Sequence, residues 1–392
     1  SGASQTGFGR TGTVDWQTSI KTTSFTAVSG EGYFIDTTSG AITMTLPASP
    51  SAGDIVSFKD YAYTFNTNNL TVADNGSNIG GGSAVNPVYS VNGTSKTLIF
   101  ADSTKGWLTT NESTDTTTGI NPLYVTATGG TITTSGNFKI HTFTGPGTFC
   151  VSCAGNAVGS NTVDYMVVAG GGAGGFTPTN SGGGGGAGGY RESSGAASGC
   201  YTASPLGACV SALPVTASAF PITVGAGGST TPGAGNSGSN SVFSTITSAG
   251  GGGGAGQSTP VTNGIAGGSG GGSAYCGSGS TGGAGNTPPV SPPQGNPGGS
   301  NSPGGNAAAG GGGGAGAAGG SADQSTTGPG TSGPGGNGVI TNINASPVTR
   351  AGGGGGKSLT ANGSGGSGGG GAAGSAGTTN TGGGGGGGNT NS

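Results

Sequence analysis

Charged residues are scarce in this chain, and so are apolar ones. Lysine, arginine, aspartate and glutamate make up 5% of the 392 residues, the formal net charge is −3, and the nine basic residues are scattered. This excludes the concentrated positive charge that nucleic acids and anionic membranes require. The hydrophobic fraction of 29% lies far below the roughly 45–50% of globular chains, and no apolar run reaches the roughly 18 residues of a membrane span. We expect neither one large conventional core nor membrane insertion.

Residues that perform acid–base chemistry are also few. His141 is the single histidine, and it alternates with Phe138 and Ile140, as a solvent-facing strand residue does. No nucleophile and base stand together, so no general acid and base pair can be named. We expect no enzyme activity and no cofactor.

The five cysteines are an odd number. Cys200 and Cys209 close a short loop and are the best disulfide candidates, which suits an extracellular or virion context. Cys150 and Cys153 form a CxxC in a strand-like setting, without the helix N-terminus that makes such a pair redox-active. We expect a structural role and no metal site, with a metal site shared with His141 or Cys276 as the alternative.

Two stretches imitate nucleotide-binding motifs. AGGGGGKS at 351–358 fits a loose P-loop, and 170–175 satisfies GxGxxG after a strand. A real site needs a strand before the loop and a helix after it, because the phosphates bind backbone N–H groups at a helix N-terminus. No helix follows either stretch, so we expect neither to bind a nucleotide.

Residues 1–115 are expected to form a small all-β sandwich or barrel. AITMTLP at 41–47 alternates apolar and polar residues, as a half-buried strand does, and turns rich in Gly, Asn, Asp and Pro separate the short strands. The further predicted strands are 55–58, 69–73 and 96–101. After a polar tract at 111–119, residues 116–168 are expected to form a β connector with a hairpin within 131–143.

Glycine is abundant, with 100 residues, and its long runs lie from residue 169 onward. A glycine run loses much backbone entropy on ordering. Extended helices with three residues per turn can offset that loss when they pack side by side and bond to their neighbours. We predict that 169–392 form a polyglycine II bundle with loops at its ends, in which a bulky residue at Gly313 would clash. A disordered Gly/Ser tail is the alternative.

Several stretches of the sequence resemble segments of bacteriophage proteins. The segment from FTAVSGEGYF to DNGSNI at 25–79, with TLIFADSTKGW at 97–107, resembles a β domain in structural and tail-fibre proteins of marine tailed phages. VDYMVVAGGGAGG at 163–175 and FSTITSAGGGGGAG at 243–256 resemble glycine-rich repeats of phage fibres and the polyglycine II sandwich of distal adhesins in T-even-like phages. The resemblance implies a virion or extracellular location, other virion fibre or tail proteins as partners, and a homo-oligomer such as a trimer.

The favoured hypothesis is a virion fibre protein or adhesin that binds a host-cell receptor, either protein or glycan, through loops on a rigid scaffold. Aromatic residues between the glycine runs suit such contacts, although each could instead belong to a local core. The candidate receptor-binding residues are Tyr190, Arg191, Tyr201, Phe220, Phe243, Tyr275, Pro289 and Val290. The alternatives are a purely structural subunit of an extracellular filament or capsid decoration, and an ice-binding protein.

Overall fold

The computed structural model is nearly all β, which confirms the expected class. The only helix within the described residues is a three-residue 3₁₀ turn, Pro205–Gly207, and no helix in that part of the chain is long and apolar enough to cross a membrane. The described residues are 14–81, 86–110, 123–156, 159–177, 181–195, 201–207, 210–256, 263–275, 279–303, 307–323 and 330–388.

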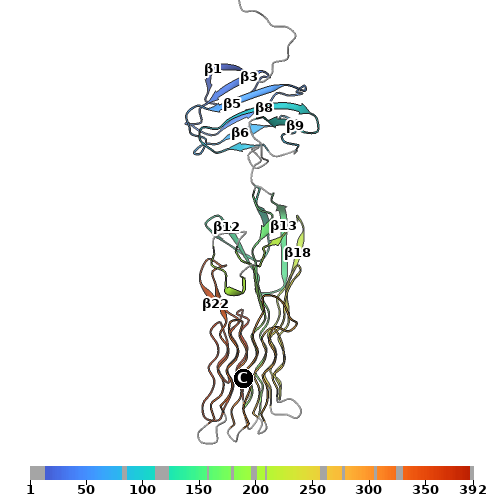
Figure 1. The fold of residues 1–392 in the computed structure, drawn as a ribbon, viewed down its shortest axis with the longest axis vertical. Coiled ribbons are helices and arrows are strands. Elements are labelled where there is room, and N and C mark those ends of the chain that lie inside the picture. Colours follow the sequence, from blue (N-terminus) through green and yellow to red (C-terminus); the bar gives the residue numbers. More distant parts are fainter. Residues whose placement is uncertain are drawn as a thin grey trace, which may run out of the picture. The chain divides into compact units, whose positions relative to one another are not determined.

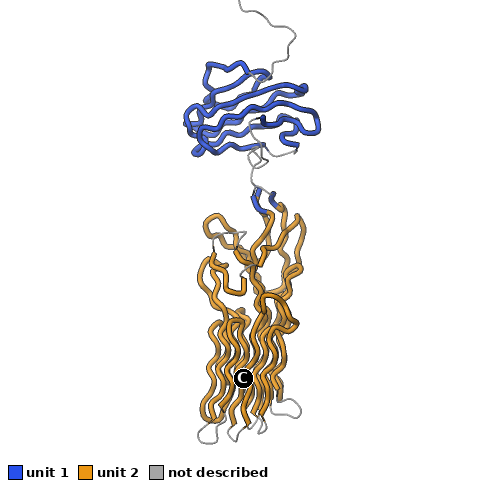
Figure 2. Tube along the Cα trace, viewed as in Figure 1, with its two compact units in different colours: residues 1–123, 155–160 blue, residues 124–154, 161–392 orange. Residues whose placement is uncertain are grey.

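The chain divides into two compact units (Figure 2). Unit 1 comprises residues 1–123 and 155–160, and unit 2 comprises 124–154 and 161–392. The sequence suggested three parts, whereas most of the strands expected in a separate connector fall within unit 2, together with the glycine-rich segments.

Unit 1 is built from two sheets. One has the order β1-β3-β5-β8-β9 and the other the order β2-β4-β6-β7. The first consists of β1 (Asp15–Lys21), β3 (Glu31–Ile35), β5 (Ile55–Asp60), β8 (Ser95–Asp102) and β9 (Gly106–Thr109). The second consists of β2 (Phe25–Thr26), β4 (Ile42–Thr45), β6 (Leu70–Ala73) and β7 (Val88–Tyr89). The four predicted strands correspond to β4, β5, β6 and β8.

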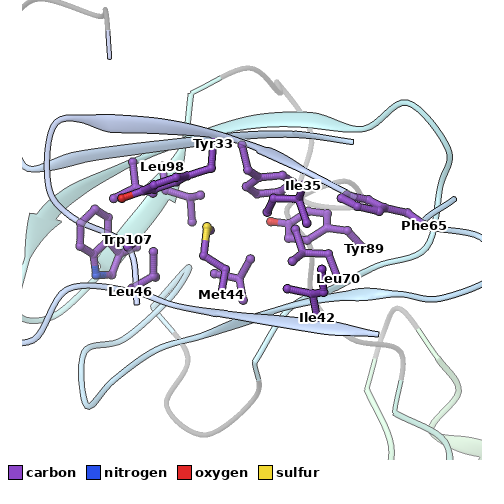
Figure 3. Close-up of a cluster of buried hydrophobic side chains, with 14 of the residues drawn as sticks. Tyr33, Ile35, Ile42, Met44, Leu46, Phe65, Leu70, Tyr89, Leu98 and Trp107 are labelled. Atoms are coloured by element: carbon purple, nitrogen blue, oxygen red, sulfur yellow. The ribbon is translucent and has the colours of Figure 1, made fainter. Parts of the chain in front are cut away.

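The core of unit 1 lies between these sheets (Figure 3). Ile42 and Met44 on β4 are buried while Thr43 and Thr45 are half-buried, which is the predicted alternation. Trp107 on β9 is completely buried and packs edge-on against Phe100, with 5.6 Å between ring centroids. The packing of large side chains from both sheets gives unit 1 its own hydrophobic core.

The strands of unit 2 form one five-stranded sheet and four two-stranded pairs. The sheet, in the order β10-β13-β18-β19-β20, consists of β10 (Val125–Thr128), β13 (Gly147–Ala154), β18 (Ala219–Thr223), β19 (Ser241–Phe243) and β20 (Ile246–Ser248). The pairs are β11 (Thr131–Ser135) with β12 (Phe138–Thr142), β14 (Thr162–Val163) with β17 (Leu213–Pro214), β15 (Met166–Val168) with β16 (Tyr190–Glu192), and β21 (Val339–Thr341) with β22 (Val348–Arg350). The antiparallel pairing of β11 and β12 confirms the predicted hairpin.

Glycine-rich segments make up most of the rest of unit 2 and run side by side (Figure 1). They include 169–177, 182–189, 249–256, 268–275, 295–303, 307–315, 330–338, 351–357 and 382–388. They are not β-strands, because consecutive residues bond to different neighbours. In segment 183–189 the donors Gly183, Gly186 and Gly189 reach Ala255, Gly252 and Ala249; Gly184 and Ala187 reach Gly310 and Gly313; Gly185 and Gly188 reach Gly385 and Gly382. Each neighbour is therefore contacted at every third residue.

Segment 182–189 has six neighbours. It donates to three segments, and three others donate to its carbonyl groups. In order around it they are 169–175, 249–255, 268–273, 307–313, 351–357 and 382–388. Consecutive neighbours are also bonded to each other, by Gly254 to Ala173, Gly252 to Ser269, Gly310 to Ser273, Gly312 to Gly354, Gly384 to Gly352 and Gly385 to Gly172. The six segments thus form a closed ring around a central one.

Close approach explains the glycines in these segments. A Cβ built on Gly184 would lie 2.0 Å from the carbonyl oxygen of Gly354, and one on Gly313 would lie 2.1 Å from that of Asn296. Neither glycine has a positive φ, so backbone conformation is not what requires glycine there. The clash expected at Gly313 is therefore present in the geometry.

Candidate functional site

The glycine-rich segments have two different ends. At one end, which we call the sheet end, they continue into strands such as β18 and β22 (Figure 1). At the other, which we call the loop end, they are joined by short connections. The described residues there are linked directly: Tyr275 N–H donates to the carbonyl of Ser181 (3.2 Å), and Ser181 Oγ donates to the carbonyl of Ala307 (2.8 Å).

One complete loop-end connection, 358–362, is held by its own side chains. Ser358 Oγ accepts the N–H groups of Thr360 (3.0 Å) and Ala361 (2.6 Å), as short turns with serine often do. Thr360 Oγ1 donates to the carbonyl of Gly330 (2.7 Å), which fixes the turn to the adjacent segment. Leu359, at its tip, is 63% exposed. The turn thus presents an apolar side chain to solvent in a fixed position.

A buried amide side chain, that of Asn301, connects segments at this end. Asn301 is 8% exposed, its Nδ2 donates to the carbonyl of Ala274 (2.7 Å), and its Oδ1 accepts from Ser280 Oγ (2.9 Å). Hydrogen bonds with partners on both sides satisfy the buried carboxamide. These hydrogen bonds therefore hold the ends of the segments in place at the loop end.

Tyr190 lies in the core at the sheet end. Its side chain is 1% exposed and belongs to a hydrophobic cluster with Val339 and Ala351. Its hydroxyl donates to Glu192 Oε2 (2.9 Å), and burial, followed by the nearby Glu192 charge, raises the pKa of Tyr190. Tyr190 is a core residue and has no surface to offer a receptor.

Phe220 and Phe243 also pack at the sheet end. They lie with Phe149 in one aromatic cluster, with ring centroids 6.1 Å apart in the Phe220–Phe243 pair and 5.8 Å apart in the Phe149–Phe243 pair. Phe243 is 9% exposed. Both residues therefore belong to a local core, which is the alternative that the sequence left open for these aromatics.

Tyr201 and Arg191 lie beside the Tyr190 core. Tyr201 is half-buried, its hydroxyl donates to the carbonyl of Ser193 (3.1 Å), and burial raises its pKa. Arg191 is half-buried, and its guanidinium reaches the carbonyl of Thr247 at 3.5 Å.

The proline-rich turn at 288–293 is at the sheet end as well. Gln294, which follows it, accepts the N–H of Tyr190 on its carbonyl (2.8 Å) and donates from Nε2 to the carbonyl of Pro288 (2.8 Å). Pro289 is exposed and Val290 half-buried. The turn could contact a partner, but only at the sheet end.

Tyr275 alone among the eight candidates lies at the loop end, where it is half-buried. The sequence did not single out Leu359. The only signal for it was that SLTAN interrupts two glycine runs, a feature shared by every other connection.

The structure describes two of the five cysteines. Cys200 and Cys209 lie outside the described residues. Cys150 and Cys153 are both free, and an irregularity in the pairing of β10 with β13 sets them opposite Thr128 and Thr126. Within the described part of the chain, no three His, Cys, Asp or Glu residues are grouped to hold a metal ion.

The P-loop imitation at 351–358 is part of the packed segments. The N–H groups of residues 351–357 all donate to carbonyls of other segments, for example Gly354 to Gly185 and Lys357 to Gly182. They are thus unavailable to phosphate oxygens.

Glu192 is a buried carboxylate that the sequence did not highlight. It is 2% exposed and accepts from Tyr190, from the N–H of Ser204 (2.9 Å) and from Thr341 Oγ1. These bonds tie β16, the 201–207 segment and β21 together. Glu192 therefore supports the sheet end structurally.

The chain was compared with known proteins and with protein families. No curated protein matches it. A family model described as "Glycine-rich domain" matches residues 144–392, which is more than half of the 392 residues and includes every glycine-rich segment. The chain therefore belongs to this glycine-rich domain family.

Proposed function

We propose that the glycine-rich segments form a polyglycine II bundle. Its support is the period of three: each neighbour of segment 183–189 is bonded at every third residue, as expected for helices with three residues per turn. Exposure follows the same period at the edge of the unit, where Thr331, Pro334 and Asn337 are the exposed residues of 330–338.

Such a bundle would be a rigid rod that displays loops. The single observation that carries the functional proposal is the closed ring of six bonded neighbours around 182–189, because it holds seven segments side by side and so brings their connections together. Binding sites are commonly built from loops on a scaffold of this kind. The loop end, with Tyr275 and Leu359, is the part proposed to contact a receptor.

The proposed biological role is that of a virion fibre protein or adhesin that attaches to a host cell. Support comes from the resemblance of 25–79 and 97–107 to a β domain of phage structural and tail-fibre proteins. The receptor, protein or glycan, and other fibre or tail proteins are its proposed partners, and the protein is proposed to act as a homo-oligomer outside the host cell.

Binding of the full-length, fluorescently labelled chain to a panel of bacterial strains tests this role. On a strain that binds it, Tyr275→Ala and Leu359→Ser should each weaken binding several-fold. The matched control is Ile340→Ser, which removes a comparably exposed aliphatic side chain (54%) at the sheet end and should leave binding unchanged.

Other outcomes would redirect the proposal. If Ile340→Ser and Leu359→Ser weakened binding equally, the loop end would have no particular role in binding. A purified chain that polymerises indefinitely and binds no strain would favour a purely structural filament subunit, because open head-to-tail contacts generate fibres.

A further inference from the structure

Three aromatic side chains form a continuous strip on the outer face of unit 1. Trp16 on β1 lies 4.9 Å from Phe34 on β3, and Phe34 lies 6.5 Å from Tyr61, just after β5, measured between ring centroids. We call these three residues the aromatic strip. Trp16 is 40% and Tyr61 52% exposed, and Phe34 alternates with Tyr33 and Ile35, which face the core. Contiguous exposed rings of this kind commonly mark an interaction surface.

The indole of Trp16 is held against the sheet. A Cβ on Gly32 would lie 2.9 Å from Cδ2 and 3.0 Å from Cε3 of the ring, so the ring occupies the space that a side chain at this position would take. Phe34 packs beside it at an interplanar angle of 31°. A ring supported in this way offers its free side to a ligand with little loss of side-chain entropy.

The charges around the strip favour an uncharged ligand. On the face of the strip, Lys59 is paired with Phe34 in register and Asp36 follows two residues after Phe34, so their formal charges cancel. The ammonium group already contacts a ring: Lys59 Nζ lies 5.2 Å from the Tyr63 centroid. Polyanions such as nucleic acids need free cations, and this lysine is engaged.

Hydrogen-bonding groups without charge stand beside the rings. Thr18 lies two residues after Trp16 on β1, and both Thr18 and Ser19 are exposed. Flat apolar faces next to hydroxyl groups match the two surfaces of a sugar ring, which has C–H bonds on its face and hydroxyls on its rim.

We propose that the aromatic strip binds an uncharged glycan, with sugar rings stacked on Trp16 and Tyr61 and hydroxyls bonded to the polar residues of β1. This site is in unit 1 and does not depend on the function proposed for the loop end.

Acrylamide quenching of the full-length chain tests the proposal, because the chain has two tryptophans and Trp107 is completely buried. The fluorescence that acrylamide can quench therefore comes from Trp16. The probes are maltohexaose, cellohexaose, laminarihexaose and xylohexaose at up to about 10 mM, an affinity range typical of weak sites. At least one should protect Trp16 from acrylamide.

Variants then assign the binding to the strip. Tyr61→Ala should weaken the active oligosaccharide by about tenfold, as the loss of one stacking ring does elsewhere, and Trp16→Ala, followed by calorimetric titration, should abolish binding. Tyr124→Ala removes a similarly exposed tyrosine (64%) in unit 2 and should change nothing. Thermal unfolding of each variant checks that the fold is retained.

Three results would overturn the proposal. One is that none of the four oligosaccharides protects Trp16. Another is protection by hexalysine alone, which would indicate a cationic partner. The third is concentration-dependent protection without any sugar, accompanied by dimerisation in sedimentation velocity, which would assign the strip to a second copy of the chain.

Discussion

Gly313 and Gly227 differ in the space that a side chain would find at each position. A Cβ on Gly313 would lie 2.1 Å from the carbonyl oxygen of Asn296, whereas the nearest atom to one on Gly227 is 3.7 Å away. Neither has a positive φ. The pair therefore separates the packing cost of a methyl group from its effect on backbone entropy.

We predict that Gly313→Ala destabilises unit 2 and that Gly227→Ala does not. Overpacking of a tight site costs roughly 1–3 kcal/mol, whereas alanine at a permissive glycine position often stabilises by about 0.4–1 kcal/mol. The measurement is the thermal unfolding of the two variants and the unchanged chain. Equal midpoints for both variants would contradict the packing described for Gly313.

Tyr89 makes the stability of unit 1 sensitive to alkaline pH. Its side chain is 6% exposed, its hydroxyl has no partner within the described residues, and burial raises its pKa to about 12. An unfolded chain loses this proton near pH 10. The contribution of neutral Tyr89 to the stability of unit 1 is thus complete below about pH 10. It falls as the pH rises toward 12, because in that interval Tyr89 ionises only in the unfolded chain.

We predict that Tyr89→Phe keeps the stability of unit 1 near pH 8 and reduces its loss near pH 11. Urea unfolding at the two pH values measures both effects. Tyr33→Phe is the contrasting variant: the Tyr33 hydroxyl donates to Glu31 (2.6 Å) and accepts from Val28 N–H (2.7 Å), so this change should lower stability already near pH 8. An unaltered alkaline loss in Tyr89→Phe would exclude Tyr89 as a source.

At the scale of elements, the position of a glycine-rich segment decides how well its amides are protected. All seven N–H groups of 183–189 donate to neighbouring segments. Segment 225–229 lies at the edge of unit 2, with Ala226, Gly227 and Ser229 exposed. Two segments of similar composition therefore differ in environment.

We predict that hydrogen exchange is far slower in 183–189 than in 225–229. Central amides should exchange only when unit 2 opens as a whole, while edge amides exchange through local fluctuations. Mass spectrometry of peptides from the two segments measures the difference. Similar fast exchange in both would contradict a bonded central segment and favour a loose glycine-rich chain.

Some elements could be predicted from the sequence, and others could not. The alternation at Ile42 and Met44 predicted β4, and the sequence pattern of 131–143 predicted the β11–β12 hairpin. Both patterns are local, so they can be recognised without the rest of the fold. Leu359 was missed, because exposure at a loop tip depends on the segments around it. Tyr190 and Phe243 were proposed as surface contacts, and their burial depends on strands distant in sequence.

At the scale of the whole molecule, each unit has its own core, and the two ends of the glycine-rich segments have different chemistry. The sheet end carries the aromatic clusters and the buried Glu192 network. Among its described residues, the loop end has little large apolar packing and relies on the hydrogen-bonded turn at 358–362 and the Asn301 amide. Variation in the connections at the loop end would therefore affect the cores less than variation at the sheet end.

The sequence by itself determined the class and the constraints of this protein. Its low charge, alternating strands and glycine runs predicted an all-β chain with a half that only close backbone contact could order. The tertiary structure alone decided which segments are neighbours and which end each residue occupies. The reason is that glycine runs are nearly identical, so their register is set by contacts such as Gly184 to Gly310 and Tyr190 to Gln294, between residues more than a hundred positions apart.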